Sequence, residues 1–248
     1  MVLPDLISHA LLPASIAATS PFSITTNHHP ELAVDGFVTE ASPDPVVEAP
    51  AQRFRRPCSK TITREQVASV AQVLGRLRDS EFLQYLVTTY YSASQASVIP
   101  SSLISSALPS LTETINAFNL FNGTADDNAE LLRLSEAVLC STSTQIHIDA
   151  SLTPSSFMGL YTGATLRLEY LGIIFSVAAR SCLIGLAKDT RQRDDFVQDM
   201  FSCSITCLKL AREITPVNDM LVWFGQDHFM LTACVEGDSS KCLNTSQR

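Results

Sequence analysis

Apolar residues recur every three or four positions through most of the chain beyond residue 60. One stripe of this kind comprises Val67, Val70, Ala71, Leu74 and Leu77, and a second comprises Phe196, Met200, Cys203, Cys207 and Leu210. Thr63 and Gln66 precede the first stripe with the spacing of a capping box. No stretch of convincing length alternates with the period of two that a half-buried strand shows. The pattern therefore predicts an all-α fold, an irregular bundle of about six to eight helices.

One segment, residues 164–187, is apolar on nearly all sides, which is typical of a helix packed on several faces. Its longest apolar run, residues 170–187, contains Arg180 near the middle. A lipid-facing guanidinium at that depth would cost several kcal/mol. We therefore expect a central helix of a bundle and no association with a membrane.

Four features mark expected helix boundaries. Ser80 can cap a second helix, and a third is expected from Ser101, interrupted or started afresh at Pro109. Residues 123–127 are expected to form a turn, because Gly123 and the acidic residues after it suit the entry to a helix. Pro216 suits the first turn of a last helix, where its missing N–H costs nothing.

The chain divides by composition into three parts. Residues 1–60 form a proline-rich, acidic arm that we expect to be disordered, since proline removes backbone donors and breaks helices. The arm ends in a basic cluster of Arg53, Arg55, Arg56 and Lys60. This cluster is interpreted as a nuclear-import signal, a phosphate-binding patch or a solvated linker. A helical domain is expected over residues 61–240, followed by a polar tail over residues 241–248.

Composition narrows the class of protein. The chain is 46% hydrophobic and carries a net charge of −8. The first value excludes wholesale disorder, and the second disfavours non-specific binding to nucleic acid, which depends on positive charge. Seven cysteines, an odd number scattered through apolar stretches, indicate reduced and mostly buried thiols in an intracellular protein rather than a disulfide framework.

Asp126, Asp127 and Glu130 match the DDxxE pattern that chelates magnesium in α-helical terpene cyclases. Acidic residues are equally expected at the beginning of a helix, where they cap the backbone N–H groups. The second magnesium motif would begin at Asn218, but valine and glutamine stand where its other ligands belong. Capping is therefore favoured, and a small all-α magnesium-dependent terpene-synthase-like lyase is the alternative.

Other candidate chemistry has a structural interpretation. Cys203 and Cys207 share a helix face and could offer two ligands to a soft metal, but both lie on an apolar stripe. Two pairs of histidine and carboxylate stand close in the sequence, His147 with Asp149 and Asp227 with His228. Neither has the context of a nucleophile. We therefore predict that the protein is not an enzyme and has no catalytic, cofactor-binding or metal-binding residues.

Residues 166–175 (LRLEYLGIIF), followed by Ala178, Ala179 and Arg180, resemble a hallmark of the fungal-specific transcription factor domain, the helical middle homology region of zinc binuclear cluster regulators. Residues 160–163 resemble its turn into that helix. Residues 83–100 resemble its opening helix, and residues 218–223 and 236–240 its next helix and closing turn. The signature residues of the resemblance are Arg167, Glu169, Gly172 and Arg180. The charged ones are interpreted as ion-paired residues that orient the central helix.

The resemblance spans roughly residues 79–240 and implies a shortened relative, because family members continue past the closing turn. The family's DNA-binding module needs six cysteines, whereas only Cys58 precedes residue 140. Direct DNA reading through a zinc cluster is therefore not expected. The resemblance implies a nuclear regulator of transcription that associates with other regulators, as a homo- or hetero-oligomer. The regulated genes would be a fungal set, such as one for secondary-metabolite biosynthesis.

Overall fold

The computed structural model describes residues 61–94, 97–121, 123, 127–186 and 193–245. Within these ranges the chain forms helices and no strand, which confirms the predicted all-α fold. The α-helices are α1 (Arg64–Gly75), α2 (Ser80–Ala93), α3 (Ser101–Ala117), α4 (Asp127–Ser143), α5 (Pro154–Gly159), α6 (Leu168–Leu183), α7 (Arg193–Ile214) and α8 (Asp219–Thr245). Two 3₁₀ turns, η2 (Arg76–Asp79) and η3 (Gly163–Thr165), join them. The predicted arm, residues 1–60, lies outside the described residues, and so do Arg53, Arg55, Arg56 and Lys60.

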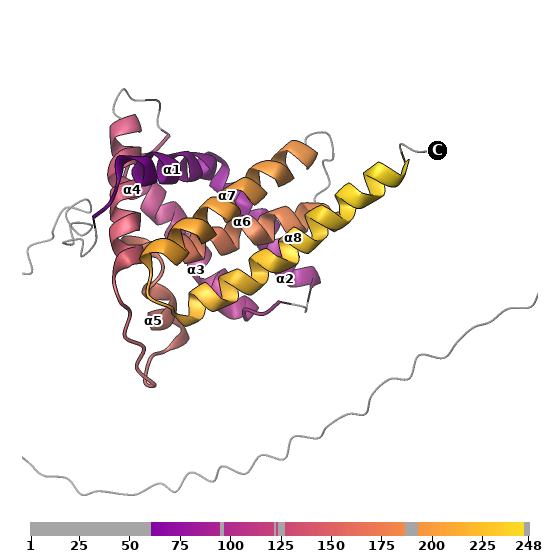
Figure 1. The fold of residues 1–248 in the computed structure, drawn as a ribbon. Helices are drawn as coiled ribbons and strands as arrows, with labels where there is room; N and C mark the ends of the chain where they lie inside the picture. The colour runs from indigo at the N-terminus through magenta and orange to yellow at the C-terminus, as the bar shows by residue number, and fades with distance from the viewer. Residues whose placement is uncertain (1–60, 95–96, 122, 124–126, 187–192, 246–248) are drawn as a thin grey trace, which may run out of the picture. The chain divides into compact units, whose positions relative to one another are not determined.

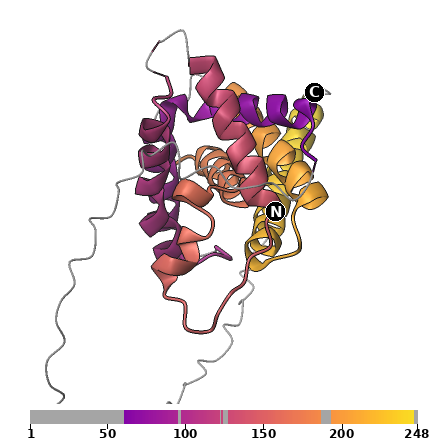
Figure 2. The same ribbon diagram turned by 90° about the vertical axis from the view of Figure 1, so that its left-hand side faces the viewer.

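Helix α6 is the centre of the bundle. Figures 1 and 2 show it enclosed by the other helices, with α2 and α3 on one side and α7 and α8 on the other. Every residue from Leu168 to Cys182 is buried, so the helix has no solvent-facing side over four turns. The prediction from the apolar segment at residues 164–187 is confirmed.

The predicted capping box at the beginning of α1 is also confirmed. The Gln66 backbone N–H donates to Thr63 Oγ1 at 3.2 Å, and the Thr63 N–H donates to Gln66 Oε1 at 3.0 Å. Val70, Val73 and Leu74 follow on the buried face of the helix. The first apolar stripe thus packs α1 into the core.

Two expected helix boundaries are wrong. Pro109 lies inside α3 and does not interrupt it. Its ring removes the N–H that would bond the Ser105 carbonyl, but Ser105 is exposed and water can bind that carbonyl instead. Ser80 is the first residue of α2 and not its cap, because the chain enters α2 directly from the 3₁₀ turn η2.

The last helix also differs from expectation at both ends. It begins at Asp219, three residues beyond Pro216, and Asn218 Oδ1 accepts the Leu221 backbone N–H at 2.9 Å as its cap. The closing turn expected at residues 236–240 is absent, and residues 241–245 of the expected tail continue the helix to Thr245. Gly237 does not end it, since one glycine costs only about 1 kcal/mol relative to alanine in a helix.

Helix α6 packs closely against α8 at Gly172. A Cβ atom added there would lie 2.0 Å from Cζ of the buried Phe224 ring. A glycine at this position therefore allows α8 to approach α6 with an aromatic ring between them.

Gly172→Ala should lower the free energy of unfolding by about 1–3 kcal/mol, because the added methyl group overpacks a rigid contact. Urea unfolding followed by circular dichroism measures it. Gly75→Ala is the matched control, since nothing lies within 4 Å of the added Cβ and Gly75 has an ordinary helical φ of −57°. That variant should be neutral or stabilised by up to about 1 kcal/mol. Equal losses in the two variants would contradict the packing argument.

Candidate functional site

A buried ion pair stands at the beginning of α6. Arg167 Nη2 lies 3.2 Å from Glu169 Oε1, and both side chains are almost fully buried. The guanidinium also donates to the carbonyls of Ser141 and Thr142 (2.6 Å) in the last turn of α4, and to the carbonyl of Thr144 (2.9 Å) just beyond it. The Ser141 carbonyl also accepts the Thr144 backbone N–H at 3.1 Å. The carbonyls at this end of α4 form the negative end of the helix dipole. Arg167 therefore fastens the end of α4 to the beginning of α6.

The same network reaches α7 and α8. Asn218, the cap of α8, donates from Nδ2 to Glu169 Oε1 at 3.0 Å. Thr215, just after α7, donates to the Thr142 carbonyl at 2.9 Å. The Thr142 hydroxyl in turn accepts the Leu168 backbone N–H at 3.0 Å. One polar cluster thus joins the ends of four helices.

A second buried ion pair lies further along α6. Arg180 bonds Asp227 of α8, and its guanidinium carbon lies 4.7 Å from the centroid of the Tyr90 ring of α2. Burial raises the pKa of Asp227, and the neighbouring Arg180 opposes this rise. The pair therefore connects α2, α6 and α8 through the middle of the bundle.

The four signature residues of the sequence resemblance are all buried in this framework. Arg167, Glu169 and Arg180 form the ion pairs, and Gly172 accommodates Phe224. Their positions agree with the interpretation that the charged residues orient the central helix.

A groove lies at the surface between α7 and α8. It has a volume of about 570 Å³ and is lined by Ile205, Leu208, Lys209, Arg212, Glu213, Gly225, His228, Phe229 and Thr232. Phe229 is 68% exposed and Ile205 is 44% exposed, although both are large apolar residues. Val222 and Met230, also on α8, are exposed as well.

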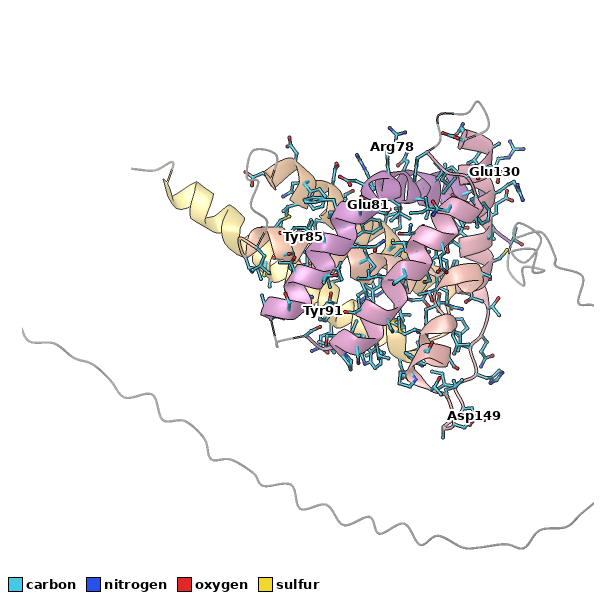
Figure 3. All side chains as sticks on the ribbon, turned by 180° about the vertical axis from the view of Figure 1, so that it is seen from behind. Arg78, Glu81, Tyr85, Tyr91, Glu130 and Asp149 are labelled. Atoms are coloured by element: carbon cyan, nitrogen blue, oxygen red, sulfur yellow. The ribbon has the colours of Figure 1, made fainter. Side chains whose placement is uncertain are left out.

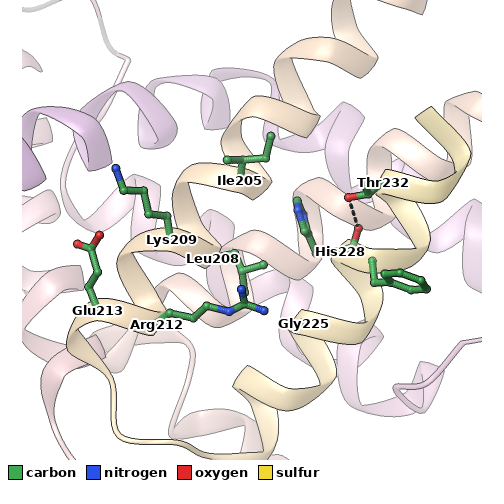
Figure 4. A pocket seen from close by; sticks show the side chains of 9 residues that line it. Ile205, Leu208, Lys209, Arg212, Glu213, Gly225, His228 and Thr232 are labelled. Carbon is green, nitrogen blue, oxygen red and sulfur yellow. Dashed lines mark hydrogen bonds between the residues drawn. The ribbon is translucent and has the colours of Figure 1, made fainter. Parts of the chain in front are cut away.

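The groove contains charged groups of both signs. Figure 4 shows Arg212 extending from α7 toward Gly225 on α8, with Lys209 and Glu213 beside it on α7. Arg212 Nη2 lies 3.9 Å from the position that a Cβ on Gly225 would take. The Arg212 guanidinium forms no hydrogen bond or ion pair with another described residue. Arg212 is therefore a cation available to a bound group.

His228 connects the groove to the core. Its Nδ1 lies 2.8 Å from the Ser204 hydroxyl, which lies 2.7 Å from the Ser176 hydroxyl of α6. Burial lowers the pKa of His228, and the charge of Arg212 lowers it further. Ser204 is fully buried, so this pair of serine and histidine cannot present a nucleophile to a substrate. The arrangement supports hydrogen bonding rather than catalysis.

A second, more polar hollow lies between α1 and α7 and includes Arg76, Arg78 and Asp199. Arg76 is already paired there with Asp199 at 3.1 Å. Because the guanidinium has its own carboxylate partner, this hollow offers less to a bound group than the groove between α7 and α8.

The acidic residues of the DDxxE pattern have structural roles where they are described. Asp127 Oδ2 accepts the Gly123 backbone N–H at 2.9 Å. Glu130, at the N-terminal end of α4 in Figure 3, pairs with Arg133 at 2.6 Å. Asp126 lies outside the described residues. Among the described side chains, no group of three His, Cys, Asp or Glu is placed to hold a metal ion.

The groove is not predicted by the sequence, in which Lys209, Arg212 and Gly225 belong to no candidate site and His228 has a structural interpretation. The sequence does contain a sign of this surface, because Val222 and Phe229 are apolar but lie outside the buried stripe of α8. Large apolar residues outside the stripe of an amphipathic helix indicate a second surface of contact.

No protein-family model, curated protein or solved structure matches this chain. Among the described helices, none is both long and apolar enough to cross a membrane. The function therefore has to be argued from the groove, the buried framework and the sequence.

Replacing Asp227 by leucine should lower the free energy of unfolding by about 3–5 kcal/mol, because Arg180 is then buried without its counter-charge. Arg180→Met combined with Asp227→Leu should cost less than the single substitution. Urea unfolding of the variants forms the test. Arg133→Met, which breaks the exposed pair with Glu130, is the control and should cost at most about 1 kcal/mol. If the free energies of unfolding lost in the two single variants simply added in the double variant, Arg180 and Asp227 would not be energetically coupled.

The thiols of α7 should be protected in the folded protein. Burial raises the pKa of Cys203 to about 11 and that of Cys207 well above its usual value. Iodoacetamide at pH 8 should therefore modify both more slowly than the half-buried Cys234, as mass spectrometry of the alkylated peptides would measure. Because these thiols ionise first in the unfolded chain, their contribution to stability should fall as the pH rises above about 8.5. Equal rates at the three cysteines would contradict the burial.

Proposed function

We propose that this chain is a transcription-regulator-like protein that acts by association with other regulators and not by reading DNA through a zinc cluster of its own. The observation that carries the proposal is the groove between α7 and α8. Exposed Ile205 and Phe229 flank it, and large apolar residues grouped at a surface are typical of protein interfaces.

The buried framework supports a role as a scaffold. Its charged groups at Arg167, Glu169 and Arg180 are paired inside the bundle, where no substrate can reach them. They hold α8 against α6 and so fix one wall of the groove. The polar groups of the core thus contribute to the shape of a contact surface rather than to a reaction.

The sequence resemblance supplies the biological context of the proposal. Residues 166–175 and the following segments resemble the middle homology region of fungal zinc-cluster regulators, in the order in which that region has them. The proposed location is accordingly the nucleus. The proposed targets are a fungal gene set, such as one for secondary-metabolite biosynthesis, reached through a partner regulator that has its own DNA-binding module.

The test is affinity capture from nuclear extract of the native cells, with the full chain as bait and mass spectrometry as readout. The wild-type chain should retain a zinc-cluster regulator. The double variant Ile205→Ser and Phe229→Ser should retain at least about tenfold less, because it removes the apolar contacts at the centre of the interface.

Leu132→Ser is the matched control, since Leu132 is a similarly exposed apolar residue on α4, away from the groove. It should retain the regulator as well as the wild type does. Recovery of chaperones alone, or equal recovery by the groove variant, would count against association through this surface.

A further inference from the structure

The groove between α7 and α8 combines an apolar floor and rim with a cation that has no partner among the described residues. From this combination we infer that its occupant is an acidic amphipathic helix of a partner protein, with a carboxylate bound at Arg212 and apolar side chains placed on Leu208, Ile205 and Phe229. This inference rests on the proposed function and specifies the chemistry of the partner.

The Arg212 guanidinium has no carboxylate partner among the described residues. The guanidinium extends over α8 at Gly225, where Nη2 lies 3.9 Å from the position that a Cβ would take (Figure 4). Arginine presents a planar array of donors that matches the two oxygens of a carboxylate. Because the described residues supply no carboxylate to Arg212, the groove can receive one from a partner.

His228 offers a second polar group to an occupant. Its Nδ1 is bonded to the Ser204 hydroxyl, which is bonded in turn to the Ser176 hydroxyl, and the donor in these bonds depends on the histidine tautomer. In the tautomer with the ring proton on Nε2, Ser204 donates to Nδ1, and the described residues provide no acceptor for the Nε2 proton. Burial and Arg212 both lower the pKa of His228, which keeps the ring neutral near pH 7. A carboxylate or carbonyl of an occupant would find a second donor there.

The charged residues that line the groove are mostly positive, although the chain as a whole is acidic. The whole chain carries −8, but Lys209 and Arg212 outnumber Glu213 in the groove. Charges further apart than about 8 Å are largely screened at physiological salt, so the groups in the groove decide what is attracted. An acidic segment is therefore complementary to this place on an otherwise acidic protein.

The shape of the groove suits a helix as its occupant. The groove runs between two helices, with Ile205 on α7 and Phe229 on α8. Grooves of this kind accept amphipathic helices whose apolar residues recur at i, i+3, i+4 and i+7. An acidic residue next to that stripe would reach Arg212 while the apolar side chains remain on Leu208.

Fluorescence anisotropy with three labelled synthetic peptides of about 14 residues tests the inference on the full chain. The acidic probe carries leucine at i, i+4 and i+7 and glutamate beside this stripe. The basic probe has lysine in place of each glutamate, and the polar probe keeps the glutamates but has serine in place of each leucine. The acidic probe should bind at least about tenfold more tightly than either of the others.

Variants locate the binding. Arg212→Gln should weaken the acidic probe by about tenfold, and Arg212→Lys by less, because lysine keeps the charge but loses the planar donors. Glu213→Gln should strengthen it by about two- to threefold, since it removes the repelling carboxylate. Arg64→Gln, an exposed arginine of α1, is the control and should change nothing. All these positions are exposed, and circular dichroism should show an unchanged melting temperature.

The outcomes separate the inference from the proposed function. Equal binding of the acidic and basic probes, lost in both upon Ile205→Ser with Phe229→Ser, would overturn the acidic preference and leave the docking surface standing. Failure of the acidic probe to bind, with groove-dependent capture of a regulator from extract, would likewise overturn only the inference. Light scattering shows whether the chain forms dimers. Dimers that dissociate upon Phe229→Ser would make a second copy of the chain the occupant of the groove, and would also overturn the inference.

Discussion

The fold depends on the complete burial of α6. A helix enclosed on every side needs partners inside the protein for its charged groups, because water cannot reach them. The neutral hydroxyls of Tyr170 and Ser181, also on α6, are buried without a hydrogen-bond partner among the described residues. Glu169 pairs with Arg167, which immediately precedes α6 and bonds the end of α4, and Arg180 pairs with Asp227 of α8. The two ion pairs therefore fix where α4, α2 and α8 lie relative to α6, and apolar packing alone would leave those positions less specific.

Periodicity was sufficient to predict the helices and the central position of α6, because both follow from local spacing of apolar residues. Periodicity did not predict helix boundaries that depend on contact with solvent or with a residue far away in the sequence. Pro109 is tolerated because the carbonyl it leaves unbonded is at the surface. Asn218 and not Pro216 marks the beginning of α8, since its amide bonds Glu169 as well as the helix backbone.

The candidate site was predictable only in part. The sequence indicated that Arg167 and Arg180 would be paired, but their partners could not all be read from it. Glu169 is two residues from Arg167, whereas Asp227 is 47 residues from Arg180, a separation at which spacing along one helix predicts no contact. The groove was not predicted because it belongs to neither helix alone. It exists where α7 and α8 meet, and spacing along one helix does not specify which face its neighbour leaves uncovered.

The core and the groove are connected through successive residues of α8. Asp227 points inward to Arg180, and the next residue, His228, lies about 100° around the helix and reaches Ser204 of α7. Phe229 lies about 100° further and reaches solvent, on nearly the same face as Gly225 four residues earlier. Once Asn218, Phe224 and Asp227 are fixed against α6, α8 cannot roll about its axis. The exposed face is then set before any partner arrives, so a partner would lose little free energy in ordering this wall of the groove.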